Sequence, residues 1–209
     1  KIKDLWKIII VCDKNSTLAK TGYALENALV LDMPPQTCDK GFAMTSSVSS
    51  MALATWCIFH YKELKKYTEY VKSIADSVES QMNDLYNAAA EIAKEDYRRI
   101  IWLGSGALKG LAREACVKSM ELTDGYVHAG YDAATGFRHG PKTVVNDETL
   151  TVHFLSDQPY TRKYDMDLLR EMISEKKANP QKRNIIVSVK EQSYRQCVSE
   201  EDYEVIWKR

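Results

Sequence analysis

The sequence has few of the features that mark a secreted, membrane-spanning or metal-binding protein. Its five cysteines are odd in number, scattered along the chain, and form no C-x-x-C pair. This pattern excludes a disulfide framework and a zinc site, and it favours a reducing cytoplasm. No apolar run reaches the roughly 20 residues that span a bilayer, because two serines and a histidine interrupt the most apolar stretch, residues 48–61.

The chain also lacks an excess of charge of either sign. Lys and Arg together number 29, as do Asp and Glu, so the formal net charge is zero. No global field attracts nucleic acid or an acidic membrane surface, so we expect neither as a partner. A small ligand fits this composition better. The 209 residues, 44% of them hydrophobic, are enough for one large or two small globular domains.

Strands and helices alternate in the hydrophobic pattern. The predicted strands cover residues 8–12, 28–32, 99–103, 126–131, 150–155, 184–189 and 203–207. The predicted helices are residues 17–23, 45–66, 74–97, 108–122, 137–144 and 164–176. This alternation predicts an α/β protein, a three-layer Rossmann-like fold with parallel sheets flanked by helices. The helix over residues 74–97 is the expected connection between two lobes.

A glycine-rich turn follows the strand at residues 99–103. Gly104, Ser105, Gly106 and Gly110 form a G-x-G-x-x-x-G pattern that leads into a helix. Backbone N–H groups at such a turn can bind a phosphate. The pattern is one residue longer than the dinucleotide motif, although Asp132 could serve a ribose. Phosphate contact, dinucleotide binding and a purely structural turn all remain open.

Hydroxyl side chains gather where the helix at 45–66 begins. Thr45, Ser46 and Ser47 are followed by Ser49 and Ser50, beside free N–H groups and the positive end of the helix dipole. Such an arrangement can hold a sugar phosphate or sugar hydroxyls. Ordinary N-capping is the alternative, and it requires only one of these side chains.

Two candidates for proton transfer lie in the second half of the chain. His139 is flanked by Arg138 and by glycines and a proline that fix the backbone, and Arg138 could hold an anion. Glu121 ends an otherwise apolar helix face, which we expect near the carboxyl edge of the sheet, where it could act as a base. The alternatives are a structural histidine and a solvated helix-end charge. His60, His128 and His153 show no paired spacing for a metal.

Four stretches, residues 39–51, 103–115, 136–142 and 159–162, together resemble the sugar isomerase (SIS) superfamily. The resemblance is to the tagatose-6-phosphate ketose/aldose isomerases of the AgaS type, also regarded as galactosamine-6-phosphate deaminases. It implies two SIS lobes. Residues 1–73 would be the latter part of the first lobe, 74–97 the connecting helix, and 98–209 the second lobe without its C-terminal end. We therefore expect a fragment whose first lobe is incomplete.

The resemblance also implies roles for particular residues. Glu121 matches the glutamate that moves a proton between C1 and C2 in the related glucosamine-6-phosphate synthase isomerase domain. His139 matches the ring-opening histidine of that domain, which is supplied across a subunit interface. Ala43, Thr45 and Ser46 match its substrate-lining segment. The chain departs from the family in lacking the serine-rich phosphate loop and the catalytic lysine of the tail.

The function implied is a cytoplasmic amino-sugar-phosphate isomerase or deaminase. It would act on a hexosamine 6-phosphate or ketohexose phosphate through ring opening and an enediol or enolamine, with no cofactor and no metal. Ser47, Gly104, Ser105, Gly106 and Arg138 complete the expected substrate contacts. We expect a homodimer or tetramer with shared sites. The alternatives are a non-catalytic SIS module that senses a phosphosugar and, on the glycine turn alone, a nicotinamide-dependent dehydrogenase.

Overall fold

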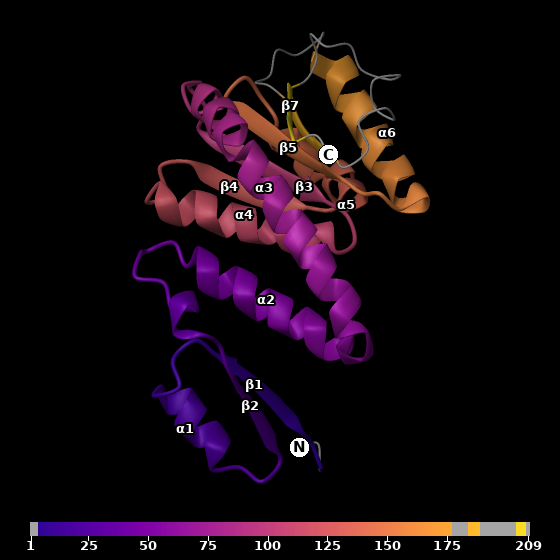
Figure 1. The fold of residues 1–209 in the computed structure, drawn as a ribbon. Coiled ribbons are helices and arrows are strands. Elements are labelled where there is room, and N and C mark those ends of the chain that lie inside the picture. Colours follow the sequence, from indigo (N-terminus) through magenta and orange to yellow (C-terminus); the bar gives the residue numbers. More distant parts are fainter. Residues whose placement is uncertain (1–3, 177–183, 189–203, 208–209) are drawn as a thin grey trace. The chain divides into compact units, whose positions relative to one another are not determined.

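The structure is a computed structural model that describes residues 4–176, 184–188 and 204–207. The chain divides into two compact units, Lys1–Glu79 and Ser80–Arg209. The division falls inside one long helix, α3 (Leu64–Ile92). Each unit is an α/β structure with a parallel sheet, as the alternation of strands and helices predicts (Figure 1).

The first unit contains a two-stranded parallel sheet. Strand β1 (Lys7–Val11) pairs with β2 (Ala28–Asp32), and helix α1 (Thr17–Tyr23) connects them. The N–H of Ala19 donates to Ser16 Oγ, which caps α1 as a serine at this position should. Helix α1 lies so close to the sheet that a β-carbon on Gly22 would be 2.7 Å from Val30 Cγ2. The predicted strand–helix–strand order is confirmed here.

The next two helices differ from the sequence prediction in where they end and begin. Helix α2 (Thr45–Phe59) stops well before residue 66, a short 3-10 helix η2 (Tyr61–Glu63) follows, and α3 begins ten residues earlier than predicted. His60 ends α2, since its Nδ1 lies 2.8 Å from the Trp56 carbonyl and its ring packs against Trp56 and Tyr67. These contacts turn the chain at a point where the hydrophobic pattern shows no break. A second 3-10 turn, η1 (Pro35–Thr37), precedes α2.

The second unit has a five-stranded sheet in the order β4-β3-β5-β6-β7, with every neighbouring pair parallel. Its strands are β3 (Arg99–Gly104), β4 (His128–Asp132), β5 (Thr149–Leu155), β6 (Asn184–Ser188) and β7 (Glu204–Trp207). Its connecting helices are α4 (Leu108–Leu122), α5 (Ala134–Arg138), η3 (Pro141–Val144) and α6 (Pro159–Lys176).

Helices cover both faces of this sheet. Successive side chains of a strand point to opposite faces, and here the side chains on both faces are apolar. On one face Ile100, Leu150 and Val152 pack with Cys116 of α4. On the other face Ile101 and Leu103 pack with Phe137 of α5 and with Leu168 and Met172 of α6. Figure 1 shows α4 and α6 on opposite sides of the sheet. Such a sheet leaves its strand ends, rather than its faces, available to ligands.

The predicted helix over residues 137–144 is wrong. The chain forms α5 first, leaves the helix at His139 and Gly140, and then makes the separate turn η3. Pro141 causes the break, since it has no N–H to donate and disfavours helical backbone at the residue before it. Helix α6 begins at Pro159, five residues before the predicted start, where a proline is well tolerated.

Candidate functional site

The turn after β3 brings the backbone close to helix α4. A β-carbon on Gly104 would lie 2.5 Å from the carbonyl oxygen of Leu108, so only glycine fits there. Gly106 has φ +61°, a left-handed conformation that glycine adopts without steric cost. Each glycine is thus required for a different structural reason, and neither reason involves a ligand. The N-cap residue of α4, Ala107, provides no side-chain cap for the helix start.

The hydroxyl of Ser105 is engaged in a buried polar network at the carboxyl edge of the sheet. It donates to Asp165 Oδ1 at 2.5 Å and accepts from the N–H of Ala134 at 3.3 Å. Asp165 Oδ2 accepts from the N–H of Ser156 at 3.0 Å, and Arg162 donates to the Ser156 carbonyl at 2.8 Å. These bonds tie the loops after β3, β4 and β5 to α6. Ser105 therefore positions the loops of this edge with its side chain.

Asp132, the candidate ribose ligand, is paired instead with a lysine. Lys109 Nζ lies 2.7 Å from Asp132 Oδ1, and this hydrogen bond raises the pKa of Lys109. The same oxygen accepts from the N–H of Ala133 at 2.7 Å. Gly136 packs against the carboxylate, since a β-carbon there would lie 2.8 Å from either oxygen. These contacts argue against the dehydrogenase alternative, which needs this carboxylate for a nucleotide.

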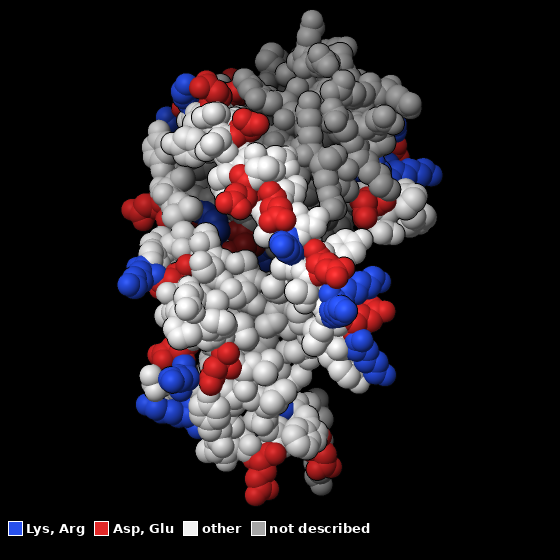
Figure 2. All heavy atoms as spheres, viewed as in Figure 1, with Lys and Arg blue, Asp and Glu red and all other residues white. Residues whose placement is uncertain are grey.

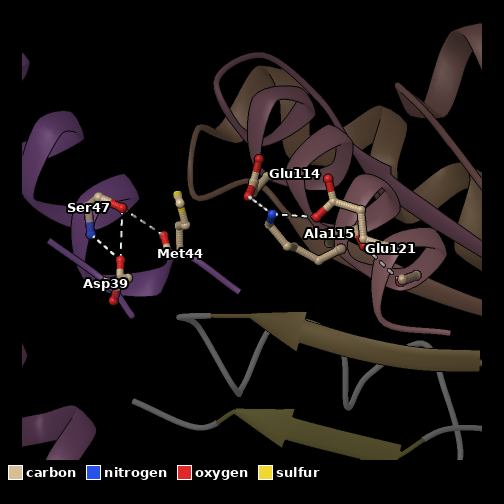
Figure 3. A network of polar contacts seen from close by, with 8 residues as sticks. Asp39, Met44, Ser47, Glu114, Ala115 and Glu121 are labelled. Carbon is tan, nitrogen blue, oxygen red and sulfur yellow. Dashed lines mark hydrogen bonds and ion pairs between the residues drawn. The ribbon is translucent and has the colours of Figure 1, made fainter. Parts of the chain in front are cut away.

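In the first unit, a carboxylate already occupies the start of α2. Asp39 accepts from the N–H of Ser46 at 3.2 Å and from the N–H and hydroxyl of Ser47, both at 2.8 Å. Figure 3 shows this contact, with the Ser47 hydroxyl also near the carbonyl of Met44. The hydrogen bonds from Ser47 hold the pKa of Asp39 below its ordinary value. An internal anion thus binds the N–H groups that the sequence offers to a phosphate.

The remaining hydroxyls of this cluster divide into two groups. Ser49 donates to the Thr45 carbonyl at 2.8 Å and Ser50 to the Ser46 carbonyl at 2.6 Å, so both bond within their own helix. Thr45 and Ser46 are exposed, Ala43 is half-buried, and Ser47 is buried. Thr45, Ser46 and Ser49 are therefore open to solvent, and the Ser46 side chain also hydrogen-bonds to Asp39.

Glu121 lies at the opposite edge of its sheet from the one that the sequence suggests. Helix α4 begins after the carboxyl end of β3, and β4 runs parallel to β3. The end of α4 must therefore return to the amino edge of the sheet, so the expected place at the carboxyl edge is wrong. Glu121 is exposed, and its Oε2 lies 2.6 Å from Lys118 Nζ.

A second acid contacts the same lysine. Figure 3 shows Glu114 and Glu121 on either side of it, with Glu114 Oε1 at 3.9 Å. The hydrogen bond to Glu121 raises the pKa of Lys118. This lysine contacts Glu121 through one of its carboxylate oxygens.

His139 is exposed at the end of α5. Its backbone N–H donates to the Gly136 carbonyl at 3.2 Å. Within the part of the chain that the structure describes, its imidazole makes no hydrogen bond or ion pair, with Glu121 or any other side chain. Arg138, expected to hold an anion of the substrate, instead pairs with Glu171 of α6 at 2.5 Å.

Sequence reasoning missed three acidic residues that organise these segments. They are Asp39, Asp165 and Glu171. Asp39 lies eight residues before Ser47, outside the spacing of a helix cap. Ser105 and Asp165 are 60 residues apart. No local pattern could have linked these pairs, because only the fold brings them together.

The other histidines take structural or surface positions. His153 is buried in β5 with Nε2 3.3 Å from Thr151 Oγ1, and His60 packs against Trp56. His128 lines a cavity of about 220 Å³, together with Ile101 of β3, Gly130 of β4 and Phe137 of α5. Across residues 4–176, 184–188 and 204–207, no three His, Cys, Asp or Glu side chains cluster as metal ligands would.

The surface carries charged side chains of both signs. Figure 2 shows Lys and Arg interspersed with Asp and Glu on the face in view, as the zero net charge leads one to expect. Among the helices that the structure describes, none combines the length and the apolar character needed to cross a membrane.

Comparison with known proteins gives a consistent set of relatives. The chain is 40% identical over 172 residues to D-galactosamine-6-phosphate deaminase AgaS of Escherichia coli, which covers 82% of the chain and 44% of the relative. It is 33% identical over 174 residues to the protein of that name from Shewanella sp. (strain ANA-3), covering 82% and 43%. The chain thus spans less than half the length of these relatives. No family model matches it.

Comparison with solved structures identifies the same family of relatives. The crystal structure of tagatose-6-phosphate ketose/aldose isomerase from Escherichia coli superposes with a TM-score of 0.72 at 37% identity. The match covers 87% of this chain and 48% of that one. The resemblance inferred from four sequence stretches is therefore confirmed, and so is the α/β fold with parallel sheets flanked by helices.

Proposed function

Since the chain is a SIS-domain protein related to the AgaS galactosamine-6-phosphate deaminases, we propose that the protein containing it is an amino-sugar-phosphate isomerase or deaminase of the cytoplasm. Its substrate would be a hexosamine 6-phosphate. The observation that carries the proposal is the 40% identity to these deaminases over 82% of the chain, together with the presence of both Glu121 and His139.

His139 opens the sugar ring in this proposal. Opening a pyranose requires a proton to leave O1 and another to reach O5, and a neutral imidazole exposed to solvent can carry protons between such oxygens. The open-chain form exposes C1 and C2 to proton transfer. The exposed position of His139, whose imidazole makes no hydrogen bond or ion pair within the described part of the chain, supports this role.

Glu121 then moves the proton between C1 and C2. The abstraction forms an enolamine, and return of the proton at C1 gives a ketimine that water hydrolyses to a ketose phosphate and ammonia. A carboxylate base needs an oxygen free to accept the proton. The ion pair with Lys118 engages Oε2, while Oε1 faces no partner among the described residues. Lys118 thus pairs with Oε2 of Glu121 and leaves Oε1 to accept the proton.

The proposed substrate contacts follow from which side chains are exposed. Thr45 and Ser46 present exposed hydroxyls suited to the sugar, beside Ala43 and the buried Ser47. Asp39 already occupies the N–H groups of Ser46 and Ser47, so the phosphate binds elsewhere unless Asp39 moves. The backbone of Gly104, Ser105 and Gly106 lies at the edge of the sheet opposite to Glu121, so it is a candidate for this phosphate only across a subunit interface. By the resemblance, the sites are shared between subunits of a dimer or tetramer.

The test is ammonia release by the intact gene product. Galactosamine 6-phosphate and glucosamine 6-phosphate are supplied separately, with ammonia and ketose phosphate both measured. Release of ammonia in step with ketose phosphate is the expected result. Binding of both sugars without any product would overturn the proposal and favour a sensing module.

A further inference from the structure

The segment that carries His139 is tied to helix α6 on both of its sides by one carboxylate. Arg138, immediately before the histidine, places Nη2 2.5 Å from Glu171 Oε2. Lys142, three residues after it, contacts Glu171 Oε1 through Nζ. The two oxygens of one side chain thus bridge the turn that presents His139.

Helix α6 is a rigid base for this bridge. Leu168, Leu169 and Met172, on the turn of helix around Glu171, are at most 1% exposed. The Glu171 side chain is 24% exposed and that of Lys142 20%, so solvent screens their interaction less than it would a surface pair. A charge removed here leaves its partners only partly solvated.

The charge states agree with this geometry. The hydrogen bond from Lys142 lowers the pKa of Glu171. Burial alone would lower the pKa of Lys142, but its hydrogen bonds to Glu171 and Glu175 raise it overall. Glu171 and Lys142 are therefore both charged near neutral pH. Glu175 Oε1 also contacts Lys142, at 2.7 Å, but it is 48% exposed and does not reach Arg138.

Among the residues that the structure describes, the His139 imidazole makes no hydrogen bond, ion pair or aromatic ring contact that would fix its place. Its backbone lies between the buried Phe137, which is 2% exposed, and Pro141, whose ring limits φ. Gly140 adds conformational freedom between them, since it has no β-carbon to restrict its backbone. The position of the imidazole thus depends on how the flanking segment is held.

We propose that Glu171 is the positioning residue of His139, bridging Arg138 and Lys142 so that the imidazole is presented in one place. The inference rests on the proposed ring-opening role of His139 and adds to it a residue that acts only through that histidine. Glu175 provides a matched control, because it is an acid of the same helix that contacts Lys142 alone.

The first experiment is a double-mutant cycle in the intact gene product, with galactosamine 6-phosphate as substrate. Glu171→Gln should lower kcat by about 10- to 100-fold, the size expected for a misplaced catalytic group, with KM changed by less than about threefold. In the His139→Ala background, where spontaneous ring opening still supplies some open-chain sugar, the same change should have almost no further effect. Glu175→Gln should change kcat by less than about twofold, as expected of a screened surface pair. Equal losses in both backgrounds would refute positioning.

The second experiment does not depend on turnover. Hydrogen exchange of the amides of residues 139–145 should be at least about tenfold faster in Glu171→Gln than in the parent, as expected when a local anchor is lost, and unchanged in Glu175→Gln. Unchanged exchange in Glu171→Gln would overturn the anchoring. A parent protein that releases no ammonia, combined with faster exchange in Glu171→Gln, would refute the proposed activity and the histidine's role in it while the anchor stands.

Discussion

The three glycines between the end of β3 and the first turn of α4 should respond differently to the same substitution. Alanine at position 104 would place its β-carbon 2.5 Å from the oxygen and 2.8 Å from the carbon of the Leu108 carbonyl. These atoms belong to the backbone of the first turn of α4, so they cannot rotate away. The strand and helix must separate, and forced overpacking of this kind costs about 1–3 kcal/mol in free energy of unfolding.

Gly106 and Gly110 provide the comparison within the same motif. Neither has an atom within 4 Å of a built β-carbon, so packing does not oppose either substitution. Gly106→Ala should still cost about 1–2 kcal/mol, because φ is +61° and a β-carbon disfavours the left-handed region. Gly110→Ala should stabilise by about 0.5–1 kcal/mol, because Gly110 lies exposed in α4 and alanine is the better helix former.

Urea unfolding followed by circular dichroism measures these differences on the intact gene product. The order of stability expected is Gly110→Ala, then the parent protein, with Gly106→Ala and Gly104→Ala below it. Equal slopes against urea would show that the native and unfolded states expose comparable surface in all four proteins. If Gly104→Ala is as stable as the parent, or if Gly110→Ala is as harmful as Gly104→Ala, the steric argument is refuted.

Three further outcomes are expected. Glu121→Gln should reduce turnover by about a hundredfold to ten-thousandfold, the usual range for loss of a general base, with sugar-phosphate affinity unchanged within a few-fold; near-normal turnover would remove Glu121 from the mechanism. Mixing inactive Glu121→Gln and His139→Ala proteins should restore activity in heterodimers, and no recovery after verified subunit exchange would exclude shared sites. Asp39 has a lowered folded pKa, so its stabilisation is present above the ordinary value of 3.8 and is lost as the pH falls through the folded pKa. Acid unfolding of Asp39→Asn should lack this contribution, and an unchanged pH profile would contradict it.

Most of the fold was predictable because its signals are local. Helix α1, strand β2 and helix α4 have the bounds that the sequence predicts, and β1 differs by one residue at each end. The two strands are continuous apolar runs, Ser16 caps α1, and the glycine turn precedes α4. A strand buried on both faces produces such a continuous run whatever its neighbours are.

The errors in the prediction have three different causes. The turn at His60 arises from its packing with Trp56 and Tyr67, and the hydrophobic period continues through it. The break after His139 could have been predicted from Pro141, because a proline disfavours helical backbone at the residue before it. Glu121 was misplaced because its helix was not followed through the parallel connection between β3 and β4.

The sequence by itself determined the class of fold, the residue types of the candidate site and the resemblance to sugar-phosphate isomerases. These properties reside in periodicity and in short motifs, where neighbouring residues carry the information. Only the tertiary structure decided which of the candidate groups are available. Asp39 fills the start of α2, Asp165 engages Ser105, and Glu171 engages Arg138. These pairs join positions well apart in the chain, where the fold alone decides which charge or hydroxyl faces which.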